Sequence, residues 1–218
     1  MTKRIGLLIP SSNTVMEVDF YRNLPVSISV HTGRMYMEAT TVEGEEEMLD
    51  SHTLPTARVL ATAKPHVVVF GCTSAGALRG NQYDAQLCQR IADVTGCRVI
   101  SVIESVRSEL RASGAKTVVI ITPYVDALND KIKVSVEADG IKVIAIHGMG
   151  ISVNFDLARP DSREIVTFVR ERLGSTIAAD ALFVSCTNFR ALSALKTLRE
   201  FFHIPVITSN QAALSAVW

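Results

Sequence analysis

Two cysteines, Cys72 and Cys186, each follow a short apolar run and open the same motif. The two copies share the pattern Cys-Thr-x-x-x-Ala-Leu. A thiolate can act as a nucleophile or as a base. Two thiols on opposite sides of a small substrate can therefore attack carbon or abstract a proton on one side and deliver a proton on the other. This chemistry suits isomerisation or racemisation and needs no cofactor.

The cysteine motifs belong to an internal repeat with an offset of 113 or 114 residues. The matching pairs of segments are 5–10 with 118–123, 29–37 with 142–150, and 67–78 with 181–192. A common offset in three consecutive segments indicates duplication of a βαβ lobe. We therefore predict two similar lobes, related by an approximate twofold axis, with the active site in the cleft between them.

Short β-branched runs alternate with longer stretches of helical period, which predicts an α/β fold with parallel sheets. The expected strands are 5–9, 27–32, 67–70, 99–102, 118–121, 142–146, 181–184 and 205–207. The expected helices are 53–63, 84–95, 102–113, 125–139, 161–173, 188–202 and one from about residue 210. We expect residues 1–112 to form the first lobe and 113–207 the second, with 208–218 packing back on the first.

The polar residues of the repeat fall where its predicted strands end. They occupy segments 10–14 and 71–74 in the first lobe and 122–124 and 185–188 in the second. Ligands of parallel sheets bind beyond the carboxyl ends of the strands. Each cysteine is expected at a junction of strand and helix, where free N–H groups and the helix dipole favour both a thiolate and a bound carboxylate.

Composition excludes several classes of partner and site. Lys plus Arg and Asp plus Glu both number 22, so we expect no nucleic-acid or membrane partner. The first apolar run is too short for a signal peptide, and four cysteines in 218 residues are too few for a disulfide framework. We expect a cytoplasmic protein.

Other patterns predict less chemistry. The five histidines lack ligand spacing and no Cys-x-x-Cys occurs, so no metal site is expected. Segment 148–150 lacks the third glycine of a dinucleotide-binding loop. We interpret Cys88 and Cys97 as core or surface residues, and the four glutamates within 43–47 as a solvated loop or helix start.

The motifs at these strand ends resemble the aspartate/glutamate racemase superfamily, and within it the branch of maleate isomerases and arylmalonate decarboxylases. The resemblance covers nearly the whole chain and rests on segments 4–14, 71–74, 122–124 and 185–187. Pro-Ser-Ser-Asn-Thr at 10–14 is typical of maleate isomerases. The resemblance implies a cofactor-independent cis-trans isomerase of a small dicarboxylate, converting maleate to fumarate.

The resemblance also implies roles for individual residues. Cys72 matches the nucleophile that adds to the alkene, and Cys186 matches the acid/base cysteine. Asn13, Tyr124 and, by a looser match, Asn154 correspond to the groups that hold the two carboxylates. The expected substrate-binding set is completed by neighbours of these motifs: Ser11, Thr73, Ser74, Thr187 and Asn188.

Departures from the relatives' patterns bear on the substrate. Amino-acid racemases of the superfamily usually carry Asp-Ser after the first strand and His after the second Cys-Thr, where this chain has 11–13 Ser-Ser-Asn and Asn188. Arylmalonate decarboxylases keep only the second cysteine, so the presence of Cys72 argues against that activity. Three alternatives remain open: an amino-acid or hydantoin racemase or epimerase, a related decarboxylase, and a small-acid binding protein. We expect a homodimer or higher homo-oligomer.

Overall fold

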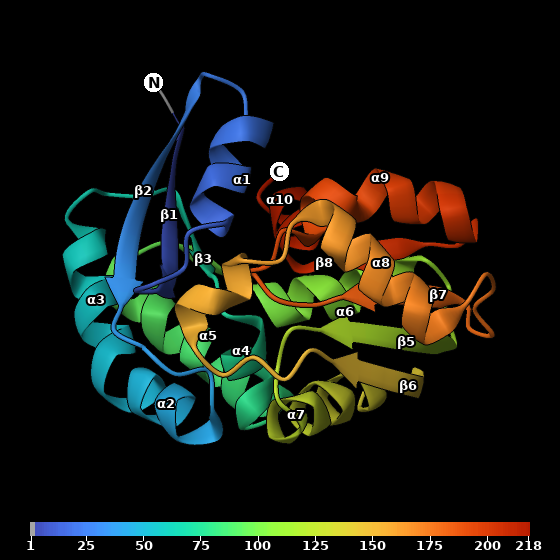
Figure 1. The fold of residues 1–218 in the computed structure, drawn as a ribbon. Helices are drawn as coiled ribbons and strands as arrows, with labels where there is room; N and C mark the ends of the chain where they lie inside the picture. Colours follow the sequence, from blue (N-terminus) through green and yellow to red (C-terminus); the bar gives the residue numbers. More distant parts are fainter. Residues whose placement is uncertain (1–2) are drawn as a thin grey trace.

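The computed structural model describes residues 3–218 as two parallel four-stranded sheets (Figure 1). The first contains β1 (Lys3–Pro10), β2 (Ile28–Met35), β3 (Val67–Phe70) and β4 (Arg98–Ser101) in the order β2-β1-β3-β4. The second contains β5 (Thr117–Thr122), β6 (Lys142–Gly148), β7 (Ala181–Val184) and β8 (Val206–Thr208) in the order β6-β5-β7-β8. The two orders are equivalent, which confirms the predicted α/β fold of two similar lobes.

The repeat in the sequence corresponds to equivalent positions in the two sheets. Ile5 of β1 pairs with Val67 of β3, and Val118 of β5 pairs with Ala181 of β7. These strands are buried, and parallel sheets covered by helices on both faces require such continuous apolar runs. The carboxyl ends of β3 and β7 therefore place Cys72 and Cys186 at matching positions.

Helices flank both sheets. Those between β1 and β5 are α1 (Met16–Asn23), α2 (Val42–Glu47), α3 (Thr53–Ala61), α4 (Thr73–Leu78), α5 (Asn81–Thr95) and α6 (Val102–Ala112). Those that follow are α7 (Asp126–Glu137), α8 (Ser162–Leu173), α9 (Ala191–Phe202) and α10 (Ser209–Ala216). A π-helical turn, η1 (Met48–His52), joins α2 to α3, and a 3-10 turn, η2 (Asn154–Ala158), precedes α8. Between residues 3 and 218, no helix has the length and apolar character that a membrane span requires.

The helices differ from the sequence prediction mainly where they are short or where they begin. The pattern did not predict α1, α2 and α4, which have six to eight residues and therefore show too few turns to display a period. The helix expected at 188–202 begins at Ala191, because the residues after β7 form a loop. The helix expected at 84–95 begins earlier, at Asn81.

Two clusters of buried apolar side chains stabilise the fold. Ile5 and Leu7 of β1 pack in one cluster with Phe20 of α1 and Ala213 of α10. Leu8 belongs to the larger cluster, which continues through α4 and α6 into the second sheet. Because successive strand residues point to opposite faces, the single apolar run of β1 contributes to both clusters.

The C-terminal helix α10 follows a strand of the second sheet but lies against α1 and α6 (Figure 1). Asn210 Nδ2 donates a hydrogen bond of 2.7 Å to Oδ2 of Asp19 on α1, and both side chains are buried. Val217 joins the apolar cluster around β1, and its carbonyl accepts a hydrogen bond of 2.9 Å from Lys3 Nζ. The residue bounds assigned to the lobes, 1–112, 113–207 and 208–218, remain predictions.

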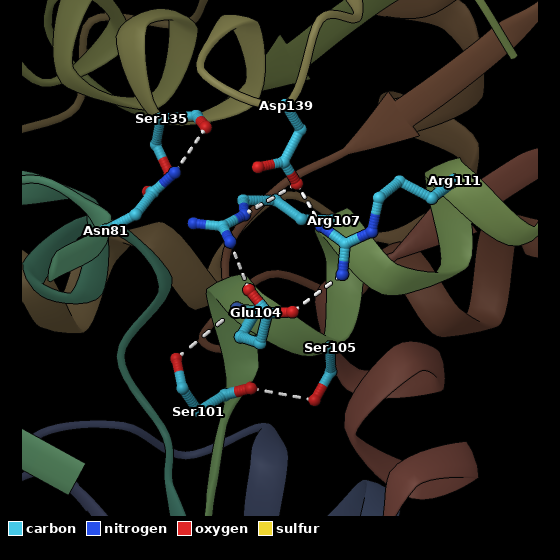
Figure 2. Close-up of polar contacts among 8 residues, drawn as sticks. All are labelled: Asn81, Ser101, Glu104, Ser105, Arg107, Arg111, Ser135 and Asp139. Carbon is cyan, nitrogen blue, oxygen red and sulfur yellow. Dashed lines mark hydrogen bonds and ion pairs between the residues drawn. The ribbon is translucent and has the colours of Figure 1, made fainter. Parts of the chain in front are cut away.

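Ion pairs connect α6 of the first half to Asp139, just after α7, in the second (Figure 2). Arg107 is buried, and its Nε lies 3.1 Å from Asp139 Oδ2 while its Nη2 contacts Glu104. Arg111, one turn further along α6, pairs with the same two carboxylates. This network connects the two halves of the chain and restrains their relative position.

Replacing Arg107 with Met keeps the length of the side chain and removes its charge. Asp139 stays paired with Arg111, so we expect the free energy of unfolding to fall by about 2 kcal/mol, measured by urea denaturation. Lys196→Met is the matched control, because it removes an exposed ion pair with Glu200 whose charged atoms are 3.8 Å apart. Equal losses in the two variants would contradict a structural role for the α6 network.

Candidate active site

A small cavity lies where the carboxyl ends of β1, β3, β5 and β7 converge. The predicted residues that line it from the first lobe are Asn13, Cys72 and Ser74. Those that line it from the second are Tyr124, Asn154, Cys186, Thr187 and Asn188. The space open to the centre of a water molecule is about 10 Å³, enough for one water molecule and too small for a dicarboxylate. A substrate must therefore enter by separating the walls.

Two predicted residues, Ser11 and Thr73, do not line this cavity. The Ser11 hydroxyl donates to the carbonyl of Met37 at 3.3 Å and accepts from its N–H at 3.1 Å. The Thr73 hydroxyl donates to Ser209 Oγ at 2.9 Å. Both side chains thus stabilise the walls, and the motifs alone could not show which side of each turn they face.

Cys72 lies between β3 and α4, and a close approach of the backbone to β1 puts it there. A Cβ atom on Gly71 would lie 2.6 Å from Ile9 Cγ2 and 2.7 Å from Met16 Sδ. A larger residue immediately before Cys72 would therefore force the side chains of Ile9 and Met16 to move. The Cys72 Sγ atom lies 3.9 Å from Ser74 Oγ, which is on the first turn of α4.

Cys186 follows β7 in a strained backbone conformation, with φ at 99°. This angle is rare for residues that carry a Cβ atom. The Cys186 N–H donates to Ser209 Oγ at 3.0 Å, and the N–H of Asn188 donates to Cys186 Sγ at 3.3 Å. These hydrogen bonds hold the loop and direct the thiol into the cavity that Cys72 also lines.

Both thiols are held in the protonated form. Burial raises the pKa of Cys72 well above its ordinary value, and the nearby Glu45 carboxyl raises it further. Burial raises the pKa of Cys186 to about 12, although hydrogen bonds from the Tyr124 hydroxyl and the Asn188 N–H oppose this. The expectation that both junctions favour a thiolate is wrong, because desolvation outweighs the short helix α4 and no helix begins directly after Cys186.

The amide of Asn13 connects the two lobes. Its Nδ2 donates to Thr187 Oγ1 at 3.0 Å, and its Oδ1 accepts from the N–H groups of Val15 and Met16, both at 3.0 Å. The Thr187 hydroxyl in turn donates to the carbonyl of Gly71 at 2.9 Å. Asn13 is therefore oriented by the start of α1, while its donor group faces the second lobe.

Asn154 closes the cavity from the other side. Its Nδ2 donates to Ser12 Oγ at 2.7 Å, and its Oδ1 accepts from Thr40 Oγ1 at 3.1 Å. Backbone hydrogen bonds reinforce the closure, with the N–H of Thr40 donating to the carbonyl of Ser152 at 2.6 Å and the N–H of Asn154 donating to that of Glu38 at 2.8 Å. The segments that carry these residues form a strap over the cavity.

Glu45 is the member of this site that sequence reasoning missed. The interpretation of 43–47 as solvated is wrong for Glu45, whose side chain is 0% exposed. Its Oε1 accepts a hydrogen bond from Ser74 Oγ, and its Oε2 has no partner among the described residues. Burial raises the pKa of Glu45 to about 8, although the Ser74 hydrogen bond opposes the rise. The available signal was helical period, because Met48 and Leu49, three and four residues later, are buried core residues.

Neutral and acidic groups surround the cavity. The described residues that line the cavity include no Lys, Arg or His. Residues 3–218 hold no cluster of three or more His, Cys, Asp or Glu placed to bind a metal ion, and all four cysteines are free thiols. Amides, hydroxyls and backbone N–H groups are therefore the groups that can hold a carboxylate between the two thiols.

The two equivalent α/β lobes each direct one thiol into a shared cavity. This arrangement defines a class of proteins that place paired cysteines around a small ligand. The family model of arylmalonate decarboxylase matches residues 5–218, and the chain belongs to this family. It is 28% identical to the maleate isomerase of Geobacillus stearothermophilus over 99% of this chain and 89% of that protein. It is 24% identical to the arylmalonate decarboxylase of Bordetella bronchiseptica over 97% of this chain and 87% of that protein.

The fold is also shared with solved structures. A crystal structure of a maleate isomerase variant from Pseudomonas putida S16 with maleate superposes with a TM-score of 0.89 at 25% identity. The match covers 99% of this chain and 90% of that chain. Nearly the whole chain therefore takes part in the similarity.

The strain at Cys186 predicts an unusual ranking of two variants. Cys186→Gly and Cys186→Ala both remove the thiol, but only alanine keeps a Cβ atom at φ 99°. The relief of strain exceeds the entropy lost by glycine, so we expect the glycine variant to have a free energy of unfolding about 1 kcal/mol higher. Urea denaturation of both proteins measures the difference. A more stable alanine variant would show that the backbone here is not strained.

Proposed function

We propose that this protein is a cis-trans isomerase of a small dicarboxylate and converts maleate to fumarate without a cofactor. The observation that carries the proposal is that Cys72 and Cys186, from opposite lobes, line one cavity among neutral hydrogen-bond donors. The similarity to the maleate isomerase of Geobacillus stearothermophilus over nearly the whole chain supports this choice of substrate.

The two thiols can complete a catalytic cycle together. The Cys72 thiolate adds to one alkene carbon, a C–S bond forms, and the π electron pair moves to the neighbouring carbon. The Cys186 thiol gives its proton to that carbon, and the new single bond rotates. The Cys186 thiolate then takes the proton back, the C–S bond breaks, and the trans acid leaves. Both cysteines return to their starting states, so no external redox partner is consumed.

The neutral polar groups of the cavity would hold the two carboxylates. Asn13, Tyr124 and Asn154 supply amide and hydroxyl donors, and Thr187 and Asn188 orient Asn13 and Asn154. In the closed cavity the amide of Asn13 donates to Thr187 and the amide of Asn154 donates to Ser12, each on the opposite lobe, so the substrate replaces those partners when the lobes separate. Donors without a positive charge bind the substrate without trapping a negatively charged intermediate. A homodimer or higher homo-oligomer is part of the proposal.

The reaction is tested by proton NMR of the purified, reduced protein with maleate in D₂O, without added metal or cofactor. We expect fumarate from the intact protein and none from Cys72→Ala, because the nucleophile is lost. Cys88→Ala is the matched control, since Cys88 is a half-buried thiol on α5 outside the cavity, and it should retain activity. If the intact protein leaves maleate unchanged, maleate is rejected, and deuterium entering amino acids or hydantoins would identify a racemase instead.

The separate roles of the thiols predict different covalent states. Cys186→Ala keeps the nucleophile, water can protonate the carbon after Cys72 adds, and no thiol remains to take that proton back, so a protein-bound adduct should accumulate. Cys72→Ala should form no adduct. Intact-protein mass spectrometry after incubation with maleate measures both, as a mass increase equal to one substrate molecule. Equal adduct yields from the two variants would contradict the assigned roles.

A further inference from the structure

A carboxyl, a hydroxyl and a thiol lie in a row beneath the cavity. Ser74 Oγ donates a hydrogen bond to Glu45 Oε1 and lies 3.9 Å from Cys72 Sγ. Glu45, Ser74 and Cys72 are 0%, 1% and 5% exposed. A serine hydroxyl both accepts and donates protons, so Ser74 can connect the thiol to the carboxyl.

The packing of α2 on α4 holds this row in place. Arg79, which follows α4, pairs with Glu46 of α2 and contacts Asp50 of η1, with Nη2 2.7 Å from Oδ2. Glu46 and Asp50 therefore bind outside the cavity. This leaves Glu45, the residue between Gly44 and Glu46, on the inner face of α2 against Ser74.

Among residues 3–218, no cationic side chain pairs with Glu45. The polar and titratable groups that act on its surroundings are Ser74, Cys72, Cys186 and Tyr124. The other charged groups of the adjoining helices face elsewhere: Glu43 and Glu47 are exposed, Glu46 and Asp50 pair with Arg79, and His52 contacts the Tyr36 ring. α4 carries no charged side chain. A carboxyl buried without a counter-ion is costly, which makes it a candidate functional group.

Ionising Cys72 alone would create a new charge in a desolvated cavity. Moving the thiol proton to an ionised Glu45 only relocates a negative charge that is already buried. We infer that Glu45 is the proton acceptor that generates the Cys72 thiolate, acting through the hydroxyl of Ser74. The inference rests on the proposed function only in taking Cys72 as the nucleophile.

The transfer is balanced in atoms and charge. The S–H bond of Cys72 breaks as Ser74 Oγ takes the proton, and the original Ser74 hydroxyl proton passes to Glu45 Oε1. The negative charge moves from the carboxylate to sulfur, and nothing is oxidised or reduced. When the product leaves, the same steps run in reverse. Glu45 does not line the cavity and acts only through Ser74 and Cys72, so it is a positioning residue.

This arrangement predicts how Cys72 reactivity depends on pH. Burial raises the pKa of Glu45 to about 8, so below that pH the carboxyl is protonated and cannot accept the thiol proton. Above it the carboxylate is present and transfer can occur. Reactivity should therefore rise with pH through about 8 and level off before an isolated buried thiol would ionise.

The test is the rate of alkylation of Cys72 by iodoacetamide between about pH 6 and pH 10, followed by peptide mass spectrometry. The Glu45→Gln variant retains an oxygen that accepts from Ser74 but cannot take a proton. We expect it to lower the rate about tenfold near pH 8 and to remove the rise at that pH. Glu47→Gln, on the same helix but exposed to solvent, is the matched control and should keep the wild-type profile.

Two outcomes would overturn the inference. Faster alkylation of Glu45→Gln would show that the carboxylate only repels the thiolate, and an unchanged pH profile would show that Glu45 is structural. Ser74→Ala is the second variant, which removes the relay while keeping Glu45, and it should lose the same rise in rate. Because the probe is iodoacetamide and not maleate, the result is readable whether or not maleate is the substrate.

Discussion

Burial of the space between the lobes determines the state of the polar groups there. It keeps both thiols protonated, leaves one oxygen of Glu45 without a partner among the described residues, and makes the amides of Asn13 and Asn154 bind groups of the opposite lobe. A thiolate in this environment forms readily only when its charge replaces another. Chemistry at the site therefore depends on proton transfers within a closed set of groups.

The same closure links binding to motion. The strap contributed by the segments around Thr40 and Asn154 leaves space for about one water molecule, so substrate exchange requires the cross-lobe hydrogen bonds to break. These are hydrogen bonds between neutral groups, and each contributes about 1 kcal/mol. Breaking them has a small free-energy cost, while several together keep the closed state populated.

Much of the fold could be predicted because the internal duplication repeats the same sequence pattern in both halves of the chain. The apolar run before Cys72 and the run before Cys186 each predict a buried strand, and their common offset predicts equivalent lobes. Eight of the ten expected site residues line the cavity, and Asn13, Tyr124 and Asn154 among them were expected from the family resemblance. Helical period with Met48 and Leu49 could have marked Glu45 as buried, but only the packing of α2 on α4 brings its carboxyl to Ser74. The positive φ of Cys186 is likewise set by the loop hydrogen bonds and not by residue type.

The helices that end the two halves pack against each other. α6 follows β4 and α10 follows β8. α6 is bound by Arg107 to Asp139, just after α7, and α10 is bound by Asn210 to α1. Each of the two helices contacts both β4 of the first sheet and β8 of the second. The pair therefore links the two sheets.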